Sequence, residues 1–468
     1  MADRYVLSHK NGRGIKEFYF SKFFEIFQHF SPAQVLVLGF AALILTGAFL
    51  LSLPIAAQNE QQTPFLTALF TATSAVCVTG LVVVDTGTHY SLFGQLVILV
   101  LIQVGGLGIM TMTTLFAFMI RKRINLRERL LIAEGINTLT LGGVVRLTRN
   151  IIGLTLLIEG IGAAILSIRF HYDLGWAKGI YYGIFHSISS FCNAGFDLFG
   201  PVYGPFSSLT AYKEDAAVSL TISTLIILGG LGFVVLSDII RNKRFSRLSL
   251  HSKLVIILTA ILITTGTALI WFLERHNTLK DLSPMGSLLA SYFQAVTPRT
   301  AGYNTLDIGS LRTTTQFLIV ILMFIGASPG STGGGIKTTT FGALLMATWA
   351  VVVGKYDTET FRRRIPTNTI FRAQAIFLLA LILVLGVTMV LTATEHTDLL
   401  TALFETVSAF GTVGLTMGLT PHLTSIGKIL IIFTMFIGRV GPLTVVFALW
   451  QRQKARKFSY PEERIIVG

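Results

Sequence analysis

Charged residues are scarce in this 468-residue chain: Asp, Glu, Lys and Arg make up only 13% of it, whereas 52% is hydrophobic. The mean hydropathy is +0.70. A typical soluble domain has about 25% charged residues. The chain also has two cysteines, and none of its Cys, His and Asp residues shows the spacing of a metal site. The composition therefore argues against a soluble protein and predicts an all-α polytopic membrane protein.

Other common signals are missing too. Residues 1–30 carry charges but lack an apolar core followed by a small-residue cleavage site, so we expect no removable signal peptide. No strand-turn-helix pattern of a dinucleotide-binding domain is visible. Any nucleotide control would therefore come from a separate partner.

What the chain does contain is long apolar segments. Eight of them are candidates to cross a bilayer of roughly 30 Å, and they lie near residues 33–55, 92–120, 151–168, 217–240, 254–273, 316–353, 373–393 and 427–450. We predict eight spans, flanked by a cytoplasmic segment at 1–32 and a cytoplasmic tail at 452–468.

The net charge of +14 follows this topology rather than indicating a nucleic-acid partner. Of 37 Lys and Arg residues, 27 lie in five segments that eight spans place on one side, at 1–22, 121–149, 241–253, 355–372 and 452–464. The positive-inside rule puts that side, and both termini, in the cytoplasm of a cell-membrane protein. Phospholipid head groups are the secondary partner of these cations.

A glycine motif recurs four times. Gly80, Gly195, Gly302 and Gly414 each follow an aromatic residue by ten positions, and they are separated by 115, 107 and 112 residues. Glycine adopts positive φ readily, which lets successive carbonyl groups turn to one side. A ring of carbonyl oxygens from four such stretches replaces the hydration shell of a cation. The repeat therefore predicts passage of a cation, with no enzymatic activity and no organic cofactor.

Cys77 and Cys192 each lie three residues before a repeat glycine, where the other units have Arg299 and Gly411. A thiol is thus not required, and we interpret both as small buried residues rather than a disulfide or metal pair.

Each repeat unit is predicted to run span, short helix, glycine turn, span. The units comprise residues 33–122, 123–242, 243–356 and 357–451, with short helices at 64–76, 178–191, 284–296 and 398–410. Hydroxyl or acidic caps at Thr63, Ser283 and Asp398 are expected to start three of these helices. The negative C-terminal ends of the helix dipoles then favour a cation at mid-membrane.

The second span of the third unit is predicted to be broken. Its segment 326–337 contains Pro329 and five glycines, which disfavour a continuous helix. A mobile loop just below the carbonyl ring is expected to act as a gate, although simple space filling is the alternative. The stretch also resembles a phosphate-binding loop, but Ile336 adds a residue to that motif and the surrounding pattern is wrong. The small residues Gly105 and Gly229 in the other second spans are interpreted as sites of close helix packing.

Few charges interrupt the apolar segments. Arg439 costs about 2.5–3.5 kcal/mol to insert unless it is paired, and we expect the carbonyls of loop 326–337 as its partners in the gate. Arg299 is interpreted as a brace for the filter backbone. Glu405 is expected either to offset Arg299 or to bind a cation outside the ring. Glu159 and His186 are assigned to helix packing.

The fourfold filter, the segment 298–304 (PRTAGYN), the glycine-rich loop and the Gly438-Arg439 pair together resemble the superfamily of K+ transporters that comprises Trk, Ktr and plant HKT proteins. The likeness covers about residues 33–450. Eight spans and a short tail are more similar to Ktr membrane subunits than to Trk ones.

This resemblance implies a pseudo-fourfold pore in each subunit, a homodimer, and a separate cytosolic ring of regulatory subunits that respond to ATP and ADP. By position, it assigns the selectivity filter for K+ to Val78, Thr79, Gly80, Asn193, Ala194, Gly195, Thr300, Ala301, Gly302, Thr412, Val413 and Gly414. It assigns the gate to Gly326, Ala327, Ser328, Pro329, Gly330, Ser331, Thr332, Gly333, Gly334, Gly335, Lys337 and Arg439.

Several alternatives stay open at this point. Glycine in all four units fits K+ selectivity, whereas superfamily members that favour Na+ often carry serine in the first unit. A Na+-permeable or Na+-coupled transporter, with Na+ also a candidate activator, is the second interpretation. A secondary carrier is disfavoured because the repeats run in parallel and nearly lack carboxylates. A membrane-embedded enzyme is disfavoured because no nucleophile-base pair or metal cluster is visible.

Overall fold

The computed structural model describes residues 30–108, 144–449 and 463, and these are mostly helical. The elements in chain order are α2 (Pro32–Ser52), η2 (Pro54–Ala56), α3 (Phe65–Val76), α4 (Thr86–His89), α5 (Leu92–Leu107), α8 (Val144–Phe191), α9 (Gly200–Tyr203), η3 (Thr210–Tyr212), α10 (Ala216–Leu231), α11 (Phe233–Arg241), η4 (Phe245–Arg247), α12 (Leu250–Glu274), α13 (Pro284–Val296), α14 (Thr313–Phe324), α15 (Thr338–Val352), β1 (Glu359–Thr360), β2 (Arg363–Arg364), α16 (Thr367–Thr394), α17 (Leu399–Gly411), η5 (Thr420–His422), α18 (Ser425–Val440) and α19 (Pro442–Leu449). The predictions for the N-terminal segment before Phe30 and for most of the tail at 452–468 lie outside the described residues.

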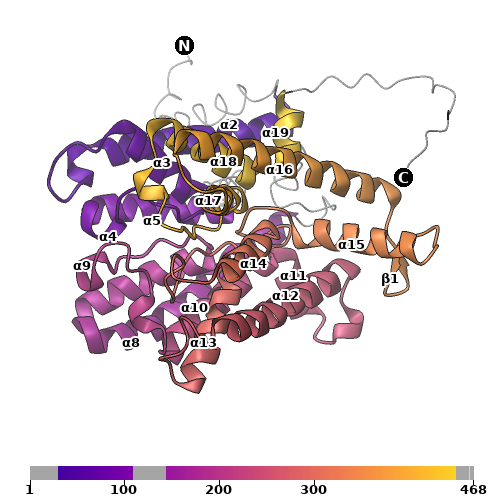
Figure 1. Ribbon diagram of the computed structural model, residues 1–468, viewed down its shortest axis with the longest axis horizontal. Helices are drawn as coiled ribbons and strands as arrows, with labels where there is room; N and C mark the ends of the chain where they lie inside the picture. Colours follow the sequence, from indigo (N-terminus) through magenta and orange to yellow (C-terminus); the bar gives the residue numbers. More distant parts are fainter. Residues whose placement is uncertain (1–29, 109–143, 450–462, 464–468) are drawn as a thin grey trace, which may run out of the picture.

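The helices surround a central region. In Figure 1, α2, α3, α5, α16 and α18 lie in the upper half, and α8, α10, α12 and α13 lie in the lower half. The short helix α17 lies near the middle of that view. Segments from the beginning and end of the chain are thus neighbours: α18 contacts α3, and α19 contacts α2.

Several helices have the length and composition of membrane spans. Within the described residues, α2, α8, α12 and α16 are long and apolar enough individually, and the pairs α10–α11 and α18–α19 qualify if each bent pair counts as one span. Only 28–39% of the residues in the span-length windows of the four single helices are buried inside the protein. The remaining apolar surface matches a lipid-facing exterior. By length and composition, the described residues thus contain four spans, or up to six with the bent pairs, whereas the sequence predicts eight.

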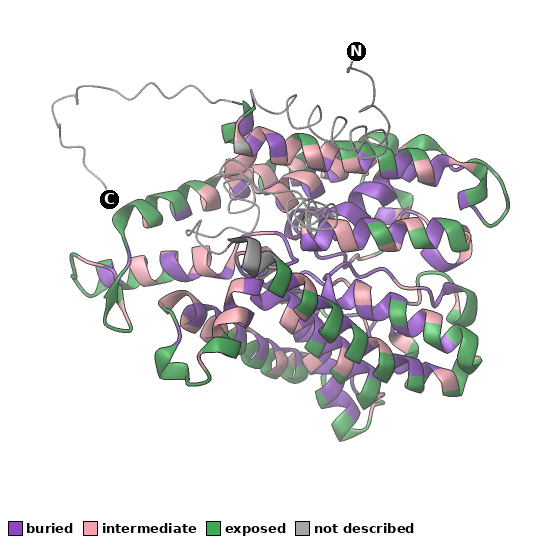
Figure 2. Ribbon diagram, turned by 180° about the vertical axis from the view of Figure 1, so that it is seen from behind, coloured by how far each residue is buried: buried purple, intermediate pink, exposed green. Residues whose placement is uncertain are grey.

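The outer surface of the long helices contrasts with the interior. Figure 2 shows exposed residues along the outer helices, and buried residues on the loops and short helices at the centre. Phe70, Phe185, Phe293 and Phe404, one on each of the four short helices, are fully buried. The core therefore sits around the short helices and the turns that follow them.

Two spans expected to be continuous are bent. The axes of α10 and α11 differ by 95° at Gly232, and those of α18 and α19 differ by 95° at Gly441. Both glycines have a positive φ, of +94° and +95°, which interrupts the helix at low cost only for glycine. Gly108 ends α5 with a φ of +84°. The bends at Gly232 and Gly441 were not predicted from the sequence, which indicated a break in the third unit.

The third unit has the predicted break. Helix α14 ends at Phe324, α15 begins at Thr338, and the residues between them form a loop. A parallel bridge between Ile325 and Ile336 closes this loop at its base. The break is longer than the single-residue breaks at Gly232 and Gly441.

Helix α8 is a hairpin rather than one long helix. Gly175 has a φ of +77° and separates an outgoing helix from a returning one. A Cβ atom at Gly183 would lie 2.6 Å from the amide nitrogen of Ser167, and one at Gly179 would lie 2.8 Å from that of His171. These two glycines allow the returning helix, predicted at 178–191, to pack tightly against the outgoing helix.

The predicted helix caps are only partly right. The Ser283 side chain caps α13 by accepting from the Gly286 amide, and Asp398 caps α17 by accepting from the Thr401 amide. Thr63 does not cap α3, because the N-cap of α3 is Pro64, which makes no side-chain cap. The Thr63 hydroxyl instead lies 3.1 Å from Nε2 of His89. The hydrogen bond between Thr63 and His89 forms in place of the predicted cap of α3.

The close packing at Gly183 generates a prediction for stability. We expect Gly183→Ala to lower the melting temperature of the purified protein, because its Cβ would overlap the Ser167 backbone. Overpacking of this kind costs about 1–3 kcal/mol. Gly160→Ala is the matched control on the same element, since a Cβ there meets nothing within 4 Å. Equal melting temperatures for the two variants would show that the hairpin does not pack as described.

Candidate functional site

Each of the four short helices ends in a turn with the same unusual backbone conformation. The residue two positions before each repeat glycine has a positive φ: +51° at Val78, +57° at Asn193, +70° at Thr300 and +49° at Thr412. Three of these residues are β-branched, for which positive φ is a true outlier. Strain of this kind costs about 1–3 kcal/mol per residue and concentrates at functional sites.

The repeat glycines form a closed ring. Their own φ values are +85°, +68°, +84° and +95° for Gly80, Gly195, Gly302 and Gly414. A Cβ on Gly80 would lie 2.5 Å from the Ala194 carbonyl oxygen, and one on Gly195 would lie 2.3 Å from that of Ala301.

The other two contacts complete the circle. A Cβ on Gly302 would lie 2.4 Å from the Val413 carbonyl oxygen, and one on Gly414 would lie 2.2 Å from that of Thr79. Each unit therefore contacts the next, and the fourth contacts the first. The sequence-predicted filter residues of all four units are brought together by the fold.

The amide groups of these turns are bound by their own short helices. The amides of Thr79 and Val413 donate to the Ser74 and Ser408 carbonyls, both at 2.8 Å. The amides of Gly80 and Gly414 donate to the hydroxyls of the same two serines, at 3.0 Å and 3.1 Å. Within the described part of the chain, the Thr79 and Val413 carbonyl oxygens accept no hydrogen bond, which leaves them available to a ligand.

These serines were not predicted as part of the site. Ser74, Ser189 and Ser408 each lie six residues before the repeat glycine, and the third unit has Val296 there. In the second unit, the Ser189 hydroxyl donates to the Phe196 carbonyl instead. In the third, the Thr297 hydroxyl donates to the Tyr303 carbonyl. The recurring hydroxyl before the glycine was the signal that would have identified them.

The loop at 326–337 lies against one end of the ring. The Thr332 hydroxyl donates to Oδ1 of Asn193 at 3.0 Å, and the Gly334 amide donates to the Thr412 hydroxyl at 2.9 Å. A Cβ on Gly333 would lie 2.0 Å from the Thr300 hydroxyl. The loop thus contacts three of the four filter units on the side of the residues with positive φ.

Other loop residues fasten this arrangement to neighbouring helices. The Ser328 amide donates to the Gly230 carbonyl at 3.0 Å, and the Gly330 carbonyl accepts from the Phe233 amide at 2.9 Å. Lys337 donates from Nζ to the Gly333 carbonyl at 2.6 Å. The lysine therefore binds within the loop itself rather than presenting its charge to a phosphate.

Arg439 joins three segments. Its guanidinium donates to the Thr332 carbonyl in the loop and to the Gly105 carbonyl at the end of α5. A further hydrogen bond of 3.2 Å goes to the Gly106 carbonyl. The predicted loop partner is present, and the two α5 carbonyls are partners that sequence spacing alone did not indicate. The buried cation is satisfied by carbonyl dipoles rather than by a carboxylate.

Close packing of the second spans holds this arrangement against the short helices. A Cβ at Gly105 would lie 2.0 Å from the Val76 carbonyl oxygen, and one at Gly229 would lie 1.9 Å from that of Phe191. Gly438 has the same relation to Phe410, at 2.0 Å. The interpretation of Gly105 and Gly229 as packing sites is confirmed.

The roles expected for two other buried charges need correction. Among the described residues, the Arg299 side chain donates to the Thr259 hydroxyl of α12 at 3.2 Å, not to the filter backbone. It is the Arg299 carbonyl that accepts from Asn193, at 3.1 Å. Glu405 does not offset Arg299, because its carboxylate accepts from Thr420 at 2.8 Å and from Thr416 and the Met417 amide in its own unit.

The remaining polar residues have packing roles. Glu159 accepts from the Gln103 side chain at 3.2 Å, an interhelical hydrogen bond as predicted. His186 is fully buried, and its Nδ1 lies 2.7 Å from the Tyr182 carbonyl. Cys77 and Cys192 are buried and unpaired with each other. Within the residues that the structure describes, no group of His, Cys, Asp and Glu has the arrangement of a metal site.

The chain is similar to several known proteins. It is 46% identical over 441 residues to the Ktr system potassium uptake protein B of Bacillus subtilis, covering 94% of this chain and 97% of the relative. It is 43% identical to the potassium/sodium uptake protein NtpJ of Enterococcus hirae, covering 94% and 97%. It is 39% identical to the Ktr system potassium uptake protein B of Vibrio alginolyticus, covering 93% and 94%.

The fold has a counterpart among solved structures. The crystal structure of the potassium transporter TrkH from Vibrio parahaemolyticus matches with a TM-score of 0.71 at 17% sequence identity, covering 95% of this chain and 93% of that one. The TrkH family model, described as a cation transport protein, matches residues 31–457. The predicted resemblance is confirmed, and transport rather than catalysis is the activity of the family: the chain belongs to the TrkH family of cation transport proteins, with Ktr-like relatives.

Proposed function

We propose that this chain conducts K+ across the plasma membrane by a channel-like path through the ring of filter carbonyls. The observation that carries this proposal is the circular series of contacts from Gly80 through Gly195 and Gly302 to Gly414 and back. Four positive-φ turns, each with an amide bound by its own unit, leave carbonyl oxygens for a dehydrated cation. We choose K+ as the ion because the relatives are named as potassium uptake proteins.

The helix dipoles add to the attraction for a cation. The short helices end at Val76, Phe191, Val296 and Gly411, shortly before their filter residues. Their C-terminal ends carry partial negative charge, equivalent to roughly half an elementary charge per helix. Four such ends directed at one ring would stabilise a cation without a carboxylate, which permits fast release.

The gate in this proposal consists of the loop at 326–337 and Arg439. The loop obstructs the path because Thr332, Gly333 and Gly334 contact three filter units from one side. Arg439 holds the loop through the Thr332 carbonyl and repels a cation leaving the filter. Opening requires these contacts to break together, which makes the loop a two-state element.

We further infer the assembly and its setting. The chain would form a homodimer with both termini in the cytoplasm and eight spans per subunit, divided into units at 33–122, 123–242, 243–356 and 357–451. A separate cytosolic ring that binds ATP or ADP would set the position of the loop. Two relatives named as parts of a Ktr system support a second component. The bilayer is the remaining partner.

A Na+-permeable or Na+-coupled transporter is the second candidate, because the relative from Enterococcus hirae is named for both potassium and sodium. Flux of K+, Rb+ and Na+ through purified protein in liposomes separates the two. Rejection of Na+ in the presence and absence of K+ supports the first proposal. Na+ flux, or K+ flux that requires Na+ on the same side, supports the second.

The filter assignment predicts the effect of a single hydroxymethyl group. Gly80→Ser should reduce K+ over Na+ discrimination by about tenfold, equivalent to ~1.4 kcal/mol. The physical reason is the Cβ position 2.5 Å from the Ala194 carbonyl oxygen. Gly386→Ser on α16 is the control, since a Cβ there meets nothing within 4 Å. Unchanged permeability ratios for Gly80→Ser in liposome flux measurements would remove Gly80 from the filter.

The gate assignment predicts a gain of flux on shortening the loop. Deletion of Ser331, Thr332, Gly333 and Gly334 should raise Rb+ uptake into liposomes in the absence of any regulatory partner, because these residues provide the contacts to Asn193, Thr300 and Thr412. A monodisperse deletion protein with the same or a lower flux would assign the loop to packing.

Arg439 is expected to oppose conduction in two ways, by holding the loop and by its charge. Arg439→Ala should increase Rb+ uptake. Arg439→Lys should retain part of the barrier, because lysine keeps the positive charge but lacks the planar guanidinium group that binds two carbonyl groups at once. Lys428→Ala removes a cation from the same helix, α18, and serves as the control. If folded Arg439→Ala protein conducts like the parent, the residue is a structural cap for carbonyls.

A further inference from the structure

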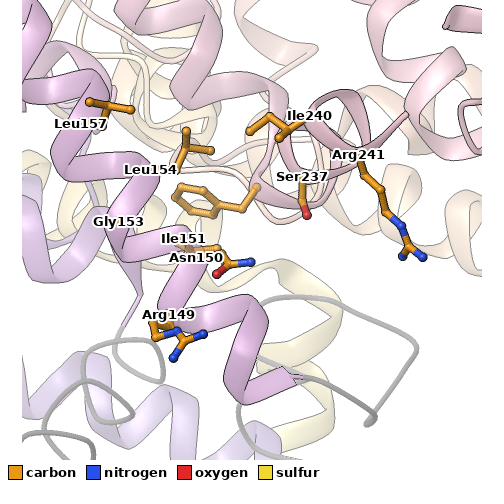
Figure 3. Close-up of a pocket in the computed structure, with 10 residues that line it drawn as sticks. Arg149, Asn150, Ile151, Gly153, Leu154, Leu157, Ser237, Ile240 and Arg241 are labelled. Carbon is orange, nitrogen blue, oxygen red and sulfur yellow. The ribbon is translucent and has the colours of Figure 1, made fainter. Parts of the chain in front are cut away.

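A cavity of about 650 Å³ lies between α8 and α11, away from the filter. Its lining residues are Arg149, Asn150, Ile151, Gly153, Leu154, Leu157, Phe233, Ser237, Ile240 and Arg241. Figure 3 shows Leu154 and Ile240 facing the space between the two helices, while Arg149 and Arg241 lie on opposite sides of it. The volume lies in the range of small-molecule binding sites.

Two cations at this cavity have no partner among the residues that the structure describes. Within the described part of the chain, neither Arg149 nor Arg241 makes an ion pair or a side-chain hydrogen bond, whereas Arg169 of the same helix α8 pairs with both Asp173 and Asp215. Asn150 and Ser237 add polar groups to the lining. Guanidinium groups favour phosphate, which they bind through charge-assisted and often bidentate hydrogen bonds.

The rest of the cavity is apolar and continues onto the lipid-facing surface. Leu157, which lines the cavity, is 60% exposed. Ile161 and Ile165 follow it on the same helical face at intervals of four residues, with exposed fractions of 55% and 44%. This stripe gives an acyl chain an apolar path along α8, the helix that also carries Arg149.

We propose that this cavity binds an anionic phospholipid, with Arg149 and Arg241 attracting its negatively charged head group and an acyl chain lying along Leu154, Leu157 and Ile161. Basic pockets between membrane helices on the cytoplasmic side bind anionic head groups, and both arginines belong to segments assigned to that side. A free phosphate or a nucleotide would use the cations but leave the apolar wall without a partner. The lipid satisfies both parts of the cavity.

The site has a direct route to the loop. Phe233 lines the cavity, and its backbone amide donates to the Gly330 carbonyl at 2.9 Å. At the bend before it, a Cβ on Gly232 would lie 2.6 Å from the Pro329 carbonyl oxygen. A lipid that holds α11 in place therefore also holds the loop. Bound lipid should favour the obstructing position of the loop and lower basal flux.

Binding is tested first, independently of transport. Native mass spectrometry of the full-length protein, titrated with phosphatidylglycerol or phosphatidylcholine, should show about tenfold tighter binding of phosphatidylglycerol, equivalent to ~1.4 kcal/mol. The double variant Arg149→Gln/Arg241→Gln should lose this preference. The control Lys355→Gln/Arg363→Gln removes two exposed cations elsewhere and should keep it.

A second variant and a competitor sharpen this test. Ser237→Phe should exclude the lipid by filling the cavity while both arginines remain. Inorganic phosphate should not displace phosphatidylglycerol, because it lacks the apolar part. Equal binding of the two lipids by the parent, retention of the preference in the double variant, or displacement by phosphate would each overturn the lipid assignment.

The coupling to the loop rests on the proposed function, and it is tested by Rb+ flux. Adding phosphatidylglycerol to phosphatidylcholine liposomes should lower the basal flux of the parent at least about fivefold, the low end of coupling between distinct sites. The arginine double variant should conduct equally in both liposomes. Equal flux of the parent in both lipids would overturn the coupling but not the binding. No flux in any liposome would contradict the proposed function and leave the binding result intact.

Discussion

The contact on which the structure depends is the approach of each repeat glycine to a carbonyl oxygen of the next unit. These approaches, at 2.2–2.5 Å for a hypothetical Cβ, exclude any side chain and fix the four turns around one another. The turns hold this position only because Val78, Asn193, Thr300 and Thr412 accept positive φ. The surrounding helices must compensate for that strain, which explains the buried serine hydroxyls and the glycines of the second spans.

Two cations near the filter are bound by backbone carbonyl groups among the described residues. Arg439 binds carbonyls of the loop and of α5, and Lys337 binds a carbonyl of its own loop. A carboxylate in these positions would bind a passing cation tightly and slow its release. Through Arg439, the loop is linked to both α5 and α18. A displacement of the loop would therefore disturb the contacts of both helices.

Much of this site was predictable from the sequence because glycine spacing is a local signal that repeats. The short helices, the break in the third unit and the loop contact of Arg439 all followed from it. The bends at Gly232 and Gly441 were missed because a positive φ is decided by the tertiary fold, not by the presence of glycine. The partners predicted for Thr63 and Arg299 were also wrong, as was the first of the two roles considered for Glu405, the offset of Arg299. For Thr63 and Arg299 the true partner is 26 or 40 residues away, and Glu405 prefers its own loop.

The central claim is that a K+-sized ion binds in the ring formed by the four glycine turns. The most direct test is an experimental structure of crystals soaked in Rb+ or Tl+, with anomalous scattering recorded. The account predicts a peak on the axis of the ring, within coordination distance of carbonyl oxygens from all four units, and its loss in Gly80→Ser. Peaks confined to the protein surface, or a ring without a peak in an otherwise well-ordered structure, would contradict it.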